Sequence, residues 1–506
     1  MGSGLLLTAA FPDLQLSGLA FVALVPLLAA IAGRRKAAAF RLGFLAGIVH
    51  YATLLPWVVY TMGTYGQLPL FLSVPLLGLL AAYLAIYPAG FAALMVHLRI
   101  PTRALAPAAG ALWTALEFLR ANLFTGFPWE LLGYSQHHWL ELIQVADITG
   151  VYGLSFLIVT INTAAFLLFW KIVGRCWRDV PITLQTASVS VLIGLLCLGG
   201  ATAYGQWRLT QIDALIAAAP QPKVAVVQGN IDQARKWDPA FQDASIDKYL
   251  RLSLKALSDF PDLVVWPETA TPFYPRDPSV LTNRLVAFVR NAQVPFLVGS
   301  PYYEERGGKI DYYNSAYLLI PGNGFDRRYD KVHLVPFGEY VPLRRLLPFV
   351  GKMVPQVGDF KAGKQGTVLE WEGRRLGVQI CYEIIFPTLA RRIMVNKADL
   401  LVNITNDAWF GRTAAPQQHF SMAVFRAVEN RRTLVRAANT GISGFIAPDG
   451  KVLAHTDLFT DAAVSQPVPL LSSQTIYTRF GDVWAWSCLV AAAAMTVSGG
   501  RPRQKR

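Results

Sequence analysis

The first 204 residues contain a series of apolar segments that are long enough to cross a lipid bilayer. A transmembrane helix needs roughly 20 consecutive apolar residues. Over the whole chain 53% of the residues are hydrophobic and 15% are charged, whereas soluble domains contain about 25% charged residues. We therefore predict a helical membrane domain over residues 1–204, and a C-terminal transmembrane helix and tail over 483–506. The predicted spans are 16–32, 37–60, 68–98, 104–119, 151–170, 182–204 and 483–497, with 5–11 as a half-span or hairpin, so that seven or eight are expected.

Basic residues gather in alternate loops between the predicted spans. Cytoplasmic loops of membrane proteins carry an excess of Lys and Arg, so we expect these loops on the cytoplasmic side of a bacterial inner membrane. Residues 205–482 would then lie in the periplasm. The net charge of +14 does not indicate a nucleic-acid partner, because the basic residues lie largely in these short loops. They are Arg34, Arg35, Lys36, Arg99, Arg103, Lys171, Arg175, Arg178, Arg501, Arg503, Lys505 and Arg506.

Residues 205–482 differ in kind from the apolar segments that precede them. Short runs rich in Val, Ile and Leu alternate with longer stretches of helical pattern. Strands that alternate with helices indicate a layered α/β domain. The expected strands are 223–228, 262–266, 295–299, 316–320, 375–380, 400–404, 434–438 and 444–447. The expected helices are 241–257, 280–291 and one that begins after Pro387.

Cys381 stands at the end of an apolar run, 376–380, that reads as a buried strand. A thiol at a strand end is held by rigid backbone and can face a cleft, which suits a nucleophile. A buried cysteine of the core is the alternative reading. Cys381 is the only cysteine between residues 205 and 482, and an unpaired thiol is unusual in an oxidising compartment. The four cysteines show no CxxC spacing, so we expect no zinc site, no disulfide framework and no cofactor.

Two further strand ends stand out in the same part of the chain. Glu268 comes after the run 263–266 and Pro267, which carry the acid toward the core. Lys331 is followed eight residues later by a second acid, Glu339. An isolated glutamate or lysine is most often a solvated surface residue. Glu268 and Lys331 are therefore candidate site residues only in combination with Cys381.

The three sequence contexts together resemble those of the nitrilase superfamily. They are WPE around Glu268, YDKVHLVPFGEYVP around Lys331 and ICYE around Cys381. With the spans before them and the single span after them, the whole chain resembles the bacterial apolipoprotein N-acyltransferase family. The resemblance implies an αββα sandwich for residues 205–482 and a catalytic Glu-Lys-Cys set.

The resemblance also implies the reaction. An acyl chain passes from a phospholipid, usually phosphatidylethanolamine, to Cys381 as a thioester, and then to the N-terminal amine of a diacylated apolipoprotein. Glu268 is expected to accept and return protons, and Lys331 to stabilise the thiolate and the oxyanion. Glu339 is expected to hold Lys331 or Glu268 in place. Tyr382 and Glu383 flank the nucleophile and either shape the pocket or serve packing and a structural ion pair.

The acyl chains have to enter from the bilayer, so apolar loops are expected around the site. The candidate segments are 233–238, which contains Trp237, 337–357, which has too few charges for an ordinary solvated loop, and 405–411, a turn with two aromatic residues. We expect Trp237, Phe349 and Trp409 to bind substrate, although Trp237 and Trp409 also fit a core position. A monomer in the lipid bilayer is expected.

Two other functions compete with the acyltransferase. The same Glu-Lys-Cys set serves hydrolysis in a membrane-anchored amidase, but a soluble amide would not require seven or eight spans. A transporter with a regulatory domain would place ionisable residues inside its spans, and the spans of this chain are nearly free of them.

Overall fold

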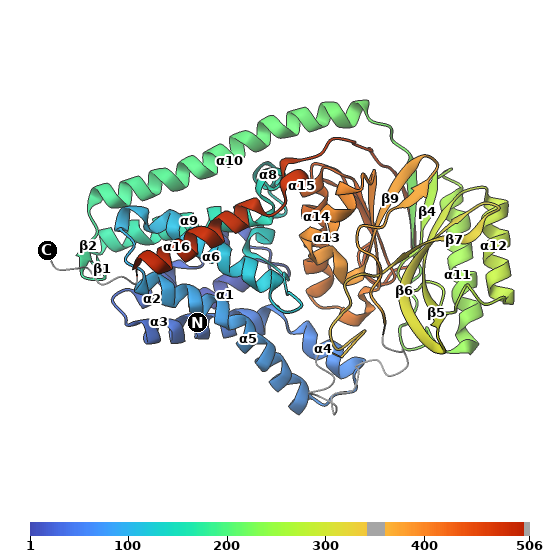
Figure 1. The fold of residues 1–506 in the computed structure, drawn as a ribbon, viewed down its shortest axis with the longest axis horizontal. Coiled ribbons are helices and arrows are strands. Elements are labelled where there is room, and N and C mark those ends of the chain that lie inside the picture. The colour runs from blue at the N-terminus through green and yellow to red at the C-terminus, as the bar shows by residue number, and fades with distance from the viewer. Residues whose placement is uncertain (342–359, 500–506) are drawn as a thin grey trace. The chain divides into compact units, whose positions relative to one another are not determined.

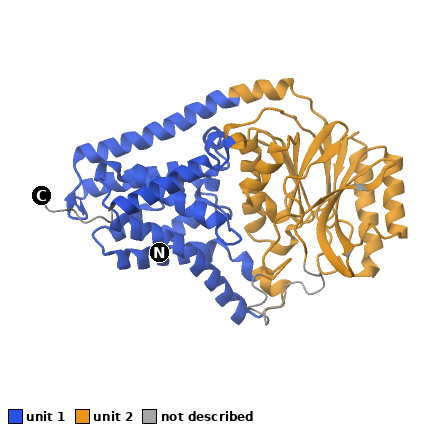
Figure 2. Cartoon of the chain, viewed as in Figure 1, with its two compact units in different colours: residues 1–59, 69–209, 480–506 blue, residues 60–68, 210–479 orange. Residues whose placement is uncertain are grey.

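The computed structural model describes residues 1–341 and 360–499, and the chain forms two compact units (Figure 2). Unit 1 comprises residues 1–59, 69–209 and 480–506, and unit 2 comprises residues 60–68 and 210–479. The short segment 60–68 therefore belongs to the same unit as residues 210–479, although about 140 residues separate the two in the chain. Nothing in the sequence of the segment indicates this.

Unit 1 is built from helices with small residues at their contacts. In α3 (Lys36–Leu54), Gly43 faces α5 (Leu70–His97), where an added Cβ would lie 2.6 Å from the carbonyl oxygen of Pro88. Small residues of this kind let two membrane helices approach closely. The other elements that lie wholly or largely in this unit are α1 (Gly2–Ala9), η1 (Ser17–Phe21), α2 (Val25–Ile31), η2 (Thr102–Ala104), α6 (Leu105–Asn122), η3 (Leu132–Gln136), α7 (Leu140–Ile143), α8 (Ala146–Thr149), α9 (Val151–Ile172), β1 (Cys176–Trp177), β2 (Val180–Pro181), α10 (Leu184–Ala218) and α16 (Val483–Gly499).

Among the described residues, four helices are long and apolar enough to cross a membrane, namely α3, α5, α9 and α10. The stretch 37–60, expected as one span, is divided: α3 ends at Leu54 and α4 (Trp57–Thr64) begins after Pro56, because proline removes a helix donor and crowds the preceding turn. The stretch 16–32 is likewise divided into η1 and α2. Of the apolar piece 5–11, residues 5–9 lie in the eight-residue α1 and the last two residues follow it.

Unit 2 contains two six-stranded sheets. In each sheet, three neighbouring strands are parallel, so their carboxyl ends lie at one edge. One sheet has the order β13 (Val452–His455), β12 (Gly444–Ile446), β11 (Leu434–Ala438), β10 (Leu400–Thr405), β9 (Arg374–Ile380) and β8 (Leu369–Trp371). The other has the order β14 (Ala462–Pro467), β3 (Lys223–Gln228), β4 (Leu263–Val265), β5 (Phe296–Arg306), β6 (Lys309–Ile320) and β7 (Gly324–Asp330).

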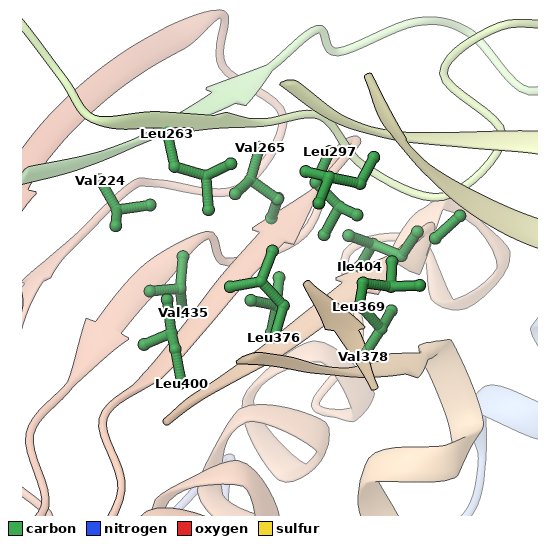
Figure 3. Packing of buried hydrophobic residues seen from close by; sticks show 14 of the residues in the cluster. Val224, Leu263, Val265, Leu297, Leu369, Leu376, Val378, Leu400, Ile404 and Val435 are labelled. Carbon is green, nitrogen blue, oxygen red and sulfur yellow. The ribbon is translucent and has the colours of Figure 1, made fainter. Parts of the chain in front are cut away.

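The two sheets pack face to face through a buried apolar core (Figure 3). Val224 and Val265 come from one sheet, and Leu376 and Val435 come from the other. Burial of such side chains contributes about 1.5–3 kcal/mol each. Helices cover the two outer faces (Figure 1), which confirms the expected αββα sandwich. They are α11 (Pro239–Leu257) and α12 (Val280–Ala292) on one side, and α13 (Pro387–Val395) and α14 (Ala415–Asn430) on the other, with α15 (Ile476–Phe480) near the end of the unit.

Every strand and helix expected in residues 205–482 has a counterpart in the structure. Four strands, β7, β8, β13 and β14, and the helices α14 and α15 were not expected. The missed strands are short or carry many charged and small residues. In α14, all 16 residues except Gln417 and Phe420 are buried. The helix therefore lacks the amphipathic pattern by which a helix is recognised in a sequence.

Candidate active site

The topology of unit 2 brings three strand ends together. β7 is antiparallel to β6, which is antiparallel to β5, so β7 ends at the same edge of its sheet as β4. Glu268 follows β4 and Lys331 follows β7 directly. Cys381 follows β9 of the facing sheet, and its thiol interacts electrostatically with both residues. The structure therefore places Glu268, Lys331 and Cys381 in one cluster.

Lys331 is the centre of this cluster. Its side chain is 1% exposed, and its Nζ lies 2.9 Å from Oε1 of Glu339 and 3.8 Å from Oε1 of Glu268. Burial alone would lower the pKa of Lys331, but the charges of Glu339, Glu268 and Cys381 raise it above its usual value. The residue is therefore a permanent cation at neutral pH.

Asn314 of β6 joins the two carboxylates. Its Nδ2 donates to Oε1 of Glu268 at 2.7 Å and to Oε1 of Glu339 at 3.0 Å. The second oxygen of Glu339 accepts a hydrogen bond from the backbone N–H of Val335 at 2.8 Å. Both carboxylates are thus oriented by fixed donors, whereas Oε2 of Glu268 has no hydrogen-bond partner within the part of the chain that the structure describes.

Cys381 has an unusual backbone conformation and a buried side chain. It is the first residue of η4 (Cys381–Ile385), its φ is +52°, and it is 7% exposed. A non-glycine residue in the left-handed region is strained, and such strain gathers at functional sites. Burial and the charge of Glu268 raise the pKa of the thiol to about 12, while Lys331 opposes the rise. At neutral pH Cys381 is therefore a thiol, and it would need a base to act as a nucleophile.

Glu383 connects the cysteine turn to the end of β7. Its Oε1 accepts from the backbone N–H groups of Val332 and His333 at 2.6 and 3.0 Å. Its Oε2 accepts from the N–H of Ile380 at 2.6 Å and from the Tyr329 hydroxyl at 2.9 Å. The side chain is fully buried. With both oxygens engaged, Glu383 holds Lys331 and Cys381 in register and has little capacity to accept a further proton donor.

A second network of buried polar side chains lies near Cys381. Oδ2 of Asp407 accepts from Arg436 at 2.7 Å and its Oδ1 lies 3.1 Å from Nδ1 of His419. Although burial opposes ionisation, Arg436 and His419 hold the pKa of Asp407 well below its usual range. Arg436 also donates to Oδ1 of Asn403, and Nδ2 of Asn403 donates to the Cys381 carbonyl oxygen at 3.4 Å. The network is thereby connected to the strained turn at Cys381.

The expected substrate-binding residues lie in different surroundings. Trp237 is partly buried beside a cavity of about 400 Å³. Trp409 packs edge-on against Tyr65 with ring centroids 4.7 Å apart, and Phe349 lies outside the described residues. Tyr382 packs its ring against Phe386 at 5.2 Å, which favours a packing role. The cavity beside Trp237 is further lined by Gln242, Pro272, Phe273, Tyr274, Asp277 and Ser279.

Sequence reasoning missed several residues of this region. Lys236 is 2% exposed and its Nζ donates to the backbone carbonyl of Glu268 at 3.0 Å. Asn314 and Arg436 also went unnoticed, because each contacts a partner at least 25 positions away and no local pattern marks it. Over the described ranges, no group of three His, Cys, Asp or Glu residues is arranged to hold a metal ion.

We predict that alkylation of Cys381 by iodoacetamide rises about tenfold per pH unit from pH 7 to pH 10 without a plateau, since a thiol with a pKa of about 12 becomes nucleophilic only as it ionises. Peptide mass spectrometry measures the rate, with the exposed Cys176 as an internal reference and Cys381→Ala as the control. A rate that levels off at or below pH 9 would show that Lys331 already holds a thiolate in the resting protein.

Comparisons with known proteins cover both units. Residues 3–164 match the family described as apolipoprotein N-acyltransferase N-terminal domain, and residues 223–474 match the family described as carbon-nitrogen hydrolase. Among solved structures, Nit3 of Saccharomyces cerevisiae, from the nitrilase superfamily, aligns at 17% identity with a TM-score of 0.39 and covers 57% of this chain and 97% of its own.

Curated relatives match over nearly the full length of the chain. An apolipoprotein N-acyltransferase of Pasteurella multocida is 32% identical over 95% of this chain and 91% of its own length. One of Geobacter metallireducens is 47% identical over 97% of this chain and 93% of its own length. The chain is therefore a membrane-embedded acyltransferase that belongs to the apolipoprotein N-acyltransferase family.

Proposed function

We propose that this protein moves an acyl chain from a phospholipid to the N-terminal amine of a diacylglyceryl-modified apolipoprotein through a thioester on Cys381. The observation that carries the proposal is the buried cluster of Glu268, Lys331 and Cys381, in a chain that matches apolipoprotein N-acyltransferases in both of its parts. Phosphatidylethanolamine is the proposed donor, and the enzyme is proposed to act as a monomer in the bilayer without nucleic acid.

In the first half-reaction Sγ of Cys381 attacks the ester carbonyl carbon of the phospholipid. Because the resting thiol is protonated, a base has to take its proton as the S–C bond forms. Glu268 fits this role, since its Oε2 is buried and has no hydrogen-bond partner among the described residues. Collapse of the tetrahedral intermediate breaks the C–O bond, and Glu268 returns the proton to the departing lysophospholipid.

Lys331 stabilises negative charge during this step. A cation fixed between Glu268 and Glu339 needs no reorganisation when the oxyanion forms, and removal of one oxyanion donor costs about 100–1,000-fold in rate in other enzymes. Glu339 is proposed as the residue that holds the ammonium in place, because its contact with Nζ, at 2.9 Å, is shorter than that of Glu268, at 3.8 Å.

In the second half-reaction the N-terminal amine of the acceptor attacks the thioester carbonyl. Glu268 takes the proton of the amine, the C–S bond breaks, and the thiol is restored as the amide forms. Transfer to water would make the protein an amidase or thioesterase, but the match to acyltransferase relatives over the membrane part as well as the sandwich favours the amine acceptor.

We propose that Trp237 and Trp409 contact the substrates, and Phe349 remains a prediction from sequence alone. Trp237 combines partial exposure with a cavity of about 400 Å³, which is large enough for part of an acyl chain or a peptide segment. Tyr382 and Glu383 are proposed to shape the turn at Cys381 and to take no part in proton or acyl transfer.

We predict that the protein mixed with phosphatidylethanolamine vesicles, without acceptor, gains the mass of one acyl group on Cys381. Intact-mass and peptide spectrometry detect the adduct, and hydroxylamine should remove it because it cleaves thioesters. Cys176→Ala, a change at an exposed thiol outside unit 2, is the matched control and should retain the adduct. An adduct that persists in Cys381→Ala would refute the proposal.

We also propose that unit 2 lies in the periplasm of a bacterial inner membrane. The alternation of basic loops in residues 1–204 supports this orientation. A reporter that is active only outside the cytoplasm, fused after Ala217, should be active in cells. The same fusion with a reporter that works only in the cytoplasm is the control, and activity of that second reporter alone would reverse the topology.

A further inference from the structure

The loop between β3 and α11 carries Trp237 and is fixed at its first end by Asn439. The N–H of Asn230 donates to the Asn439 carbonyl oxygen at 2.8 Å, and the N–H of Ile231 donates to its Oδ1 at 2.9 Å. Nδ2 of Asn439 in turn donates to the carbonyl oxygen of Ile231 at 2.8 Å. Since Asn439 follows β11, this end of the loop is tied to the sheet that bears Cys381.

The second end of the loop is fixed by a buried lysine. Lys236 is 2% exposed, and its Nζ donates to the backbone carbonyl oxygen of Glu268 at 3.0 Å. Burial lowers the pKa of Lys236 to about 8, and the charge of Glu268 opposes this shift. Burying an ammonium costs several kcal/mol unless hydrogen bonds and an opposite charge offset it, and here both come from one residue, Glu268.

The turn that bears Glu268 is tight and strained. Thr269, the next residue, has a φ of +50°, a conformation that is strained for a non-glycine residue. Gly299 of β5 lies so close that an added Cβ would be 2.3 Å from the Pro267 carbonyl oxygen and 2.7 Å from Cα of Glu268. Such a turn holds its shape only if its surroundings fix it, and the Lys236 ammonium supplies a charged hydrogen bond at its centre.

We propose that Lys236 is a positioning residue that holds the Glu268 turn in its reactive conformation and ties it to the loop bearing Trp237. This inference rests on the proposed function of Glu268 as the base. Lys236 bonds the backbone of Glu268, leaving the carboxylate to Asn314, Lys331 and the substrate. A change at Lys236 therefore moves the base without removing it, and a displacement of about 1 Å lowers rates by as much as about 100-fold.

The test is single-turnover acyl-enzyme formation from labelled phosphatidylethanolamine vesicles by the full-length protein. Lys236→Met keeps the length of the side chain and removes the ammonium. It should lower the maximal rate about 10–100-fold and change the half-saturating lipid concentration by less than about twofold, because the lipid site is intact. Lys248→Met is the matched control: Lys248 pairs with Asp461 at 2.8 Å on the surface of the same unit, and its loss should leave the rate unchanged.

A double variant separates positioning from a general loss of structure. In the Glu268→Gln background the base is already gone, so adding Lys236→Met should lower the residual rate by less than about twofold. A folded Lys236→Met variant with the wild-type rate would overturn the inference, as would a full additional loss in the double variant. If Lys236→Met does not fold, Lys236→Gln replaces it with the same expectations, and a wild-type rate there is equally decisive.

Failure of the inference and failure of the proposed function give different results. If the wild-type protein forms no acyl-enzyme, the proposed function is wrong and the Lys236 variants have no rate to change. If the wild type forms it and Lys236→Met changes only the half-saturating lipid concentration, then Lys236 acts on lipid binding and the positioning role is refuted.

Discussion

The ammonium of Lys331, 1% exposed and set between two carboxylates, is the interaction on which the rest of the site depends. A buried charge left without partners costs several kcal/mol, so the fold has to deliver Glu339 and Glu268 to the same point. The topology does this because β4 and β7 end at one edge of their sheet. Asn314 then donates to both carboxylates, through the same two oxygens that face the cation.

Burial and the same charges decide the protonation state of Cys381. Burial raises the pKa of its thiol, the charge of Glu268 adds to the rise, and Lys331 opposes it. The outcome is a neutral thiol at rest, which an oxidising environment attacks more slowly than a thiolate. In the proposed reaction, ionisation of Cys381 is coupled to the arrival of an ester carbonyl, when Lys331 would stabilise the developing oxyanion. The thiol would then become reactive only when substrate is bound.

Much of this arrangement can be predicted from the sequence, and there are physical reasons why the rest cannot. The strands β3 and β11 are predicted with their observed bounds because a central strand, buried on both faces, reads as a continuous apolar run. Glu268 and Cys381 stand out because each follows such a run. Lys236 and Arg436 escape notice because their partners, Glu268 and Asp407, lie 32 and 29 residues away in the chain.

The membrane part shows a similar limit. Hydropathy finds apolar segments but responds weakly to a single proline, so the break at Pro56 between α3 and α4 is not seen. The segment 60–68 that follows the break joins unit 2, where the Thr61 hydroxyl donates to the Trp409 carbonyl oxygen at 2.8 Å and the Tyr65 hydroxyl to that of Ala408 at 2.9 Å. Contacts over more than 340 positions leave no mark in local composition.

The central claim is that Glu268 acts as a base and not only as a charge. The most direct measurement is the single-turnover rate of acyl-enzyme formation in Glu268→Gln at pH 7.5. Loss of the carboxylate removes a charge that raises the thiol pKa, so electrostatics alone would favour the thiolate and speed the reaction. We expect the opposite, a fall of about 100-fold or more, because no group is left to take the proton. A rate equal to or above that of the wild-type protein would contradict it.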